Sequence, residues 1–127
     1  MKTLYTLLLV LSLSFTAPSL SAQILVDRVN INDLDITYCK LRAYYVSLIS
    51  KNANVNIYID YGQEFRKLNA QRIQNPDGSK REFHSIIDAF NFMEKNGWEY
   101  IDHLVAEDHG MQYLFRRKNI EQPGPDG

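Results

Sequence analysis

Residues 85–98, SIIDAFNFMEKNGW, form the stretch that decides the fold of this sequence. Its apolar side chains recur at the three- and four-residue spacing of one helical stripe, which contains Ile86, Ala89, Phe90 and Met93. Ser85 is suited to cap the first free amides, Asp88 stands at the capping-box position, and Gly97 provides a left-handed stop. The stretch therefore predicts one amphipathic helix from about Ser85 to Asn96.

Two antiparallel hairpins are expected on either side of this helix. The downstream hairpin is predicted to have strands at residues 98–106 and 111–118, joined by a polar turn. The upstream hairpin is predicted to have strands at residues 36–49 and 55–61, also joined by a polar turn. Shorter strands are expected at residues 24–29 and 68–73. The predicted fold is α+β: an antiparallel sheet of four to five strands, built from the two hairpins, with the helix on one face.

Alternation along the predicted strands assigns their side chains to faces. The inward set of the first long strand is expected to be Cys39, Leu41, Ala43 and Tyr45. In the last hairpin, one face is expected to carry Trp98, Tyr100 and Leu104. Gly62 is expected to end or bulge its strand, and Trp98 to pack beneath the helix.

The N-terminus has the three-part layout of a secretory signal. A basic start precedes an apolar run over residues 4–15, and small residues lie before a cleavage point between Ala22 and Gln23. We expect residues 1–22 to be a signal peptide, 23–118 to be one domain, and 119–127 to be a disordered tail. The mature protein is then periplasmic or extracellular, without a transmembrane anchor.

Charge and cysteine content exclude further classes. The sequence has 14 basic and 15 acidic residues, and removal of Lys2 leaves 13 minus 15, or −2. A near-neutral chain without a long basic run argues against a nucleic-acid partner. The single cysteine, Cys39, has no partner for an internal disulfide, and no histidine close in sequence would activate it as a nucleophile. A buried thiol is the expected role.

One group of residues could support metal chemistry. Asp102, His103 and His109 lie on the last hairpin with Glu107 and Asp108, and their side chains are suitable zinc ligands. Adjacent strand residues point to opposite faces, however, and acidic residues are ordinary in a polar turn. We therefore expect no metal and no cofactor here, with a metal-assisted or acid–base enzyme as the alternative. His84 is the remaining histidine.

The chain is rich in tyrosine, which is common at binding surfaces. Tyr44, Tyr58 and Tyr100 are candidates for an exposed row that holds a peptide, a glycan or a second copy of the domain. The alternative is that they lie half buried at strand edges with wet hydroxyl groups.

Several motifs resemble those of a family of small secreted proteins from Bacteroidetes-type bacteria. They are Tyr38-Cys39, Asp60-Tyr61-Gly62-Gln63, the pattern Phe83-x-Ser85-x-x-Asp88-Ala89-Phe90-Asn91-x-Met93, Gly97-Trp98-Glu99 and the ending at residues 113–118. The resemblance covers residues 38–118, with Tyr61 where phenylalanine is usual. Its second half is also similar to tiny domains with a helix–Gly-Trp-Glu–hairpin core. The family has no assigned activity, so the resemblance implies export and the fold but no catalytic residue.

Three functions remain open from the sequence. The first, which we favour, is a non-catalytic binding or interaction module of the cell envelope that works through the sheet face not covered by the helix. Its partner would be an envelope protein, a peptide or a glycan. The second is the enzyme described above, and the third is a structural subunit, for example a homodimer, that assembles through a sheet edge.

Overall fold

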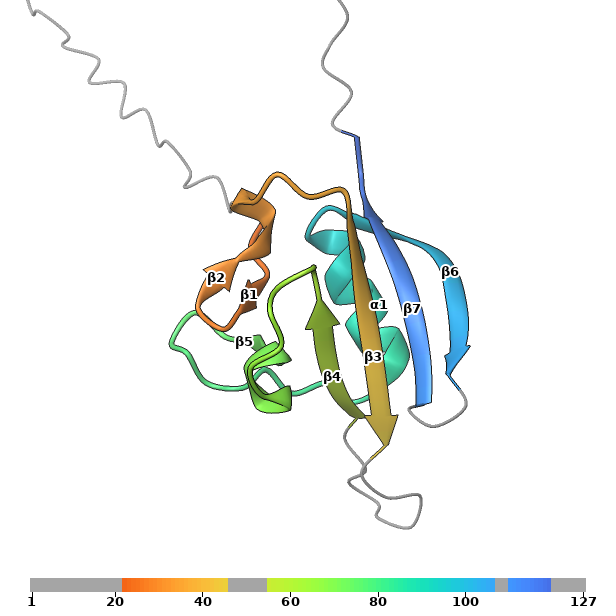
Figure 1. Cartoon of the computed structure of the whole chain (residues 1–127), viewed down its shortest axis with the longest axis horizontal. Helices are drawn as coiled ribbons and strands as arrows, with labels where there is room; N and C mark the ends of the chain where they lie inside the picture. Colours follow the sequence, from red (N-terminus) through yellow and green to blue (C-terminus); the bar gives the residue numbers. More distant parts are fainter. Residues whose placement is uncertain (1–21, 46–54, 107–109, 120–127) are drawn as a thin grey trace, which may run out of the picture.

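The computed structural model describes residues 22–45, 55–106 and 110–119. Its main element is a four-stranded antiparallel sheet in the order β4 (Val55–Asp60), β3 (Tyr38–Tyr45), β7 (Gly110–Arg117) and β6 (Trp98–Ala106). Helix α1 (Ile86–Lys95) lies behind this sheet, and no described element lies in front of it (Figure 1). The α+β class, both hairpins and the one-sided position of the helix are confirmed.

A second sheet corrects the prediction of a single one. It has three very short strands in the order β2 (Val29–Asn30), β1 (Leu25–Val26) and β5 (Ile73–Gln74). The expected strand 24–29 is broken because Asp27 and Arg28 form a tight turn with φ of 49° and 66°. The expected strand 68–73 is mostly a 3₁₀ helix, η2 (Leu68–Gln71). A further 3₁₀ helix, η1 (Ile31–Asp33), follows β2.

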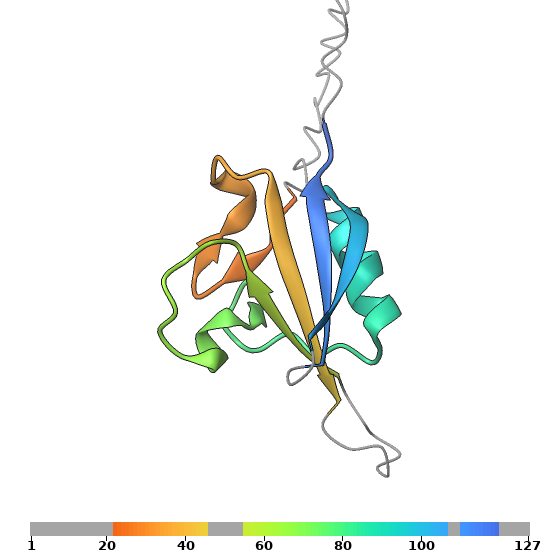
Figure 2. The same ribbon diagram turned by 45° about the vertical axis from the view of Figure 1, so that its right-hand side comes forward.

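Helix α1 begins and ends where the sequence indicates. Ser85 Oγ accepts a hydrogen bond from the Asp88 amide at 3.1 Å, and Asp88 Oδ2 accepts one from the His84 amide at 3.1 Å. The second bond goes to the residue before the cap, so it is a variant of the capping box. Gly97 follows with φ of 90°, a conformation in which other residues are strained. Figure 2 shows the helix on one side of β7 and β6.

The core lies between α1 and the two sheets. Ala89 and Met93 of the helix are fully buried, as is most of Trp98 at 1% exposure, which confirms its predicted position. The sheets contribute the remaining buried apolar side chains, among them Ile24, Val26, Ile31, Cys39, Leu41, Ala43, Ile57, Ile59, Ile73 and Phe115. The short second sheet therefore closes one side of the same core.

One predicted face assignment is wrong, and one residue predicted to point inward is exposed. Tyr45 alternates in phase with Cys39, Leu41 and Ala43 but is 56% exposed, because it lies at the end of β3, beyond the area that the core covers. Leu104, at 52% exposure, does not share a face with Trp98 and Tyr100. The β6–β7 register shifts between Tyr100 and Asp102, and one extra residue in a strand reverses the direction of every later side chain.

Several expectations fall outside the described residues. These concern the signal peptide over residues 1–21, the turn at 51–54, the loop at 107–109 and the tail at 120–127. In the part of the chain that the structure describes, no helix is long and apolar enough to span a membrane.

Arg117 connects the small sheet to the large one. Its guanidinium donates to the carbonyl groups of Ile31, Asn32 and Leu34 at 2.9–3.0 Å, and it lies 5.1 Å from the centre of the Trp98 ring. Trp98 Nε1 donates to Asn32 Oδ1 at 2.7 Å. Asn32 is thus held by both side chains, and the segment around η1 is fixed to the start of β6 and the end of β7.

We predict that Arg117→Lys destabilises the domain by about 2 kcal/mol, because an ammonium group cannot reach three carbonyl groups in different directions. Chemical denaturation of the mature domain measures this. Arg116→Lys is the matched control: Arg116 is an exposed neighbour whose ion pair is with Glu99 at 2.8 Å, and its change should leave the midpoint nearly unaltered. Equal midpoints for the two variants would contradict the connecting role of Arg117.

Candidate functional site

The three candidate tyrosines do not form one row. Tyr44 and Tyr58 lie on the open face of the large sheet, where their rings meet edge to face at 5.5 Å between centroids. Tyr100 lies on the helix face, where it stacks on Phe90 at 5.3 Å. A ligand that contacts all three is therefore not supported by the arrangement.

Tyr58 is also covered. Its exposed fraction is 4%, since the Arg72 guanidinium lies 5.4 Å from its ring centre and donates to its hydroxyl group at 3.1 Å. Tyr44 is half buried beside it. Other side chains of the open face form ion pairs: Lys40 and Arg42 with Asp60, and Arg116 with Glu99. The hydrogen bond with Glu99 raises the pKa of Arg116.

The predicted metal candidates come together only in part. Asp102 Oδ1 lies 3.8 Å from His103 Nδ1 and accepts a hydrogen bond from the His103 amide, and Tyr100 Oη is 3.0 Å from the same ring nitrogen. His109, Glu107 and Asp108 are outside the described residues, and His84 is exposed elsewhere. Within the described ranges no three His, Cys, Asp or Glu side chains are grouped as metal ligands.

Cys39 is a buried free thiol, as the sequence indicates, at 2% exposure. Burial raises its pKa to about 12, with a smaller contribution from Asp60 and an opposing one from Arg117. A thiol in this state is a poor nucleophile because the thiolate is the reactive form. Its role in the described structure is to fill the core.

The raised pKa predicts a loss of stability at alkaline pH. The unfolded chain releases the Cys39 proton above about pH 8.5, whereas the folded protein retains it, so stability falls as pH rises above that value. Between about pH 9 and pH 10 the wild type should lose about 1 kcal/mol more than Cys39→Ala does. Urea denaturation of both proteins at each pH measures the difference. Parallel stability curves would show that Cys39 titrates normally in the fold.

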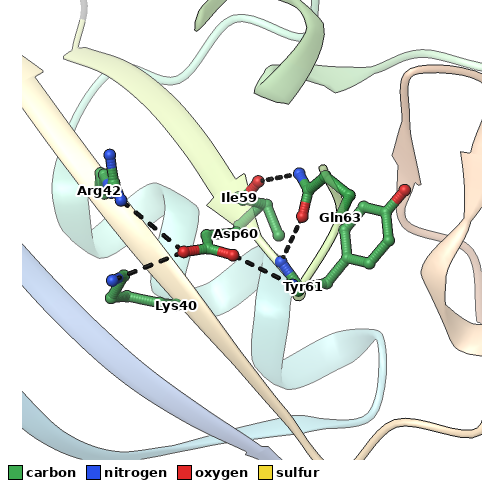
Figure 3. Close-up of polar contacts among 7 residues, drawn as sticks. Lys40, Arg42, Ile59, Asp60, Tyr61 and Gln63 are labelled. Carbon is green, nitrogen blue, oxygen red and sulfur yellow. Dashed lines mark hydrogen bonds and ion pairs between the residues drawn. The ribbon is translucent and has the colours of Figure 1, made fainter. Parts of the chain in front are cut away.

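The turn after β4 is held by its own side chains (Figure 3). Gln63 Oε1 accepts from the Tyr61 amide at 2.8 Å, and Gln63 Nε2 donates to the Ile59 carbonyl at 2.9 Å. Asp60 accepts from the Gly62 amide at 3.0 Å and pairs with Lys40 at 3.5 Å and Arg42 at 3.7 Å. Gly62 has φ of 96° and ends the strand as predicted. The resemblance motif at residues 60–63 therefore builds a fixed turn.

A cavity of about 390 Å³ opens beside this turn. Two segments far apart in sequence line it: the β1–β2 turn with Val29, and the continuous stretch from Tyr61 through η2 to Gln71. Four of its lining residues are charged, namely Asp27, Glu64, Arg66 and Lys67. No local pattern in the sequence points to this site, because nothing in either segment indicates that the two meet.

The exposed edge of the large sheet carries an apolar patch. Strand β6 has a strand partner on one side, β7, among the described residues. We define the β6 patch by the large apolar side chains exposed on this strand and on the neighbouring strand β7: Tyr100, Ile101, Leu104, Val105 and Met111. Burial raises the pKa of Tyr113 at its margin, and Tyr45 and Tyr100 lie near enough to add to the effect.

Comparisons with known proteins do not identify either site. No protein-family model matches this chain, and neither curated proteins nor solved structures give a significant match. The family resemblance noted from the motifs therefore stays a prediction, and function has to be argued from the geometry of the β6 patch and the cavity.

Proposed function

We propose that this protein is a non-catalytic interaction module of the cell envelope, which binds an extended segment of another protein along β6. One observation carries the proposal: the edge of β6, which has no strand partner among the described residues, coincides with the β6 patch. Exposed patches of large apolar side chains are typical of protein interfaces, and tyrosine and methionine are enriched in them. An open strand edge adds main-chain hydrogen-bonding groups for an incoming strand.

The charge of the edge favours a basic, extended partner over a second copy. Asp102 lies in the middle of β6, with its side chain 68% exposed, and its described ion partner is His103 rather than a lysine or an arginine. Antiparallel pairing of two copies around this position would set two Asp102 carboxylates opposite one another, which is unfavourable. A strand with alternating apolar residues and one basic residue would satisfy both the patch and Asp102.

We predict that selection of displayed random peptides against the mature domain yields such alternating, basic sequences. The exchange of Leu104 and Val105 for lysine should raise the dissociation constant of a selected peptide at least tenfold, about 1.4 kcal/mol. Both side chains are exposed, at 52% and 74%, so the variant should fold. Isothermal calorimetry measures the affinity, and Lys95→Gln on the helix surface is the control.

Hydrogen exchange of the β6 amides should slow in the peptide complex. Peptides that bind the double variant and the wild type equally would contradict the proposed surface. A concentration-dependent dimer that dissociates in the same variant, seen by analytical ultracentrifugation, would instead make a second copy the occupant of β6.

Export forms the second half of the proposal. The backbone nitrogen of Gln23 lies 3.0 Å from Asn96 Oδ1, and Asn96 is the C-cap of α1. Cleavage after Ala22 would place the new ammonium group at the C-terminal end of the helix, where positive charge is favourable. The cleavage point expected from the sequence is thus compatible with the fold of the domain.

We predict that the full chain, produced in a secreting bacterium, is recovered from the envelope or medium with Gln23 as its first residue. Intact-mass measurement identifies the cleavage point. Leu8→Arg, which places a charge in the apolar run, should prevent export and leave the residues before Gln23 attached. An exported wild-type protein that retains Met1 would contradict the prediction.

A further inference from the structure

The cavity beside the turn after β4 is a second site, separate from the β6 patch, because β4 and β6 are opposite edges of the large sheet. Its volume of about 390 Å³ falls in the range of small-molecule sites, about 300–1,000 Å³. Its lining is mixed: Tyr61 is half buried, Val29 and Ala70 add apolar surface, and polar or charged side chains complete the wall.

Gln71 is the unusual residue of this cavity. Its exposed fraction is 6%, and its Oε1 atom is buried without a hydrogen-bond partner among the described residues. Buried side-chain oxygens in proteins normally accept a hydrogen bond, so an unpaired one indicates a missing donor. Gln63 also lines the cavity, but its side-chain oxygen and nitrogen already form hydrogen bonds with the backbone of residues 61 and 59.

The charged groups at the cavity are also unpaired. Asp27, Glu64, Arg66 and Lys67 form no ion pair with any residue in the described ranges. Two carboxylates and two cations, all of them on exposed residues, therefore line one cavity without an ion pair among the described residues to neutralise them. A ligand with a single charge would complement one sign and repel the other, whereas a zwitterion complements both.

We propose that this cavity binds a short peptide with both termini free. Its carboxylate would pair with Arg66 and Lys67, its ammonium group with Asp27 and Glu64, and its peptide N–H would donate to Gln71 Oε1. A dipeptide meets these three requirements together, and a free amino acid lacks the peptide N–H. The proposal goes beyond the interaction at β6, since it uses none of the same residues.

The test is an NMR titration of the ¹⁵N-labelled mature domain with dialanine. Dialanine should shift the amide signals of residues 61–71 saturably. Acetyl-dialanine, which has no ammonium group, and dialanine amide, which has no carboxylate, should each bind at least tenfold more weakly. No saturable shift, or equal affinity for the blocked and free peptides, would overturn the proposal.

Variants assign the binding to the cavity. Lys67→Gln, Glu64→Gln and Gln71→Leu should each weaken dialanine binding, with about a tenfold loss, or about 1.4 kcal/mol, for Gln71→Leu. Gln71→Leu removes a buried amide oxygen that has no partner among the described residues, so the domain should stay folded, which the same spectra verify. Lys95→Gln and Asp35→Asn are matched controls on other surfaces. Dialanine binding that none of the three cavity variants weakens would place the peptide elsewhere and reject the site, while leaving the β6 proposal untouched.

Discussion

The contact of the Arg117 guanidinium with the backbone around η1 is the interaction on which the rest of the structure depends. The small sheet has strands of two residues, too short to be stable alone, and it closes the core only while it is held against the large sheet. Arg117 provides this connection at the η1 end through three carbonyl groups, with the ring of Trp98 beneath its charge, and the bridge between Tyr58 and Arg72 provides a second one beside β5. Because Asp27 is in the turn between β1 and β2, the same contact indirectly positions one wall of the cavity.

The sequence alone predicts those helices and strands whose residues show a local periodic pattern. The helix follows from its 3.6-residue apolar period and its two caps, and the long strands follow from their alternation. It was insufficient where a single residue changes the backbone path. Arg28 in a left-handed turn is rare for a residue with a side chain, so nothing predicted that residues 24–29 would fold back as two strands. No pattern in the sequence indicates the extra residue between Tyr100 and Asp102 either, yet it moves Leu104 to the opposite face.

The candidate sites could be predicted from the sequence even less completely than the fold. The tyrosines were identified by residue type, but only the fold shows that Tyr58 is covered by Arg72 and that Tyr100 belongs to the helix face. The β6 patch depends on the bulge, which lets apolar side chains appear on both faces of one edge strand. The cavity depends on two segments, the β1–β2 turn and residues 61–71, that meet through long-range packing, and a buried glutamine has no distinctive pattern in a sequence.

The bulge also explains how β6 can remain open without general aggregation. A long, flat and apolar edge is a template for uncontrolled pairing, and natural proteins interrupt such edges with bulges and charges. In β6 the bulge at Ile101 and the charge of Asp102 fall together in the middle of the strand. An incoming strand must then accommodate the twist and supply a complementary charge, which excludes most extended sequences. Three strand spacings, about 14 Å in all, separate this edge from β4, so the ligands proposed for the cavity and for the β6 patch would bind independently of one another.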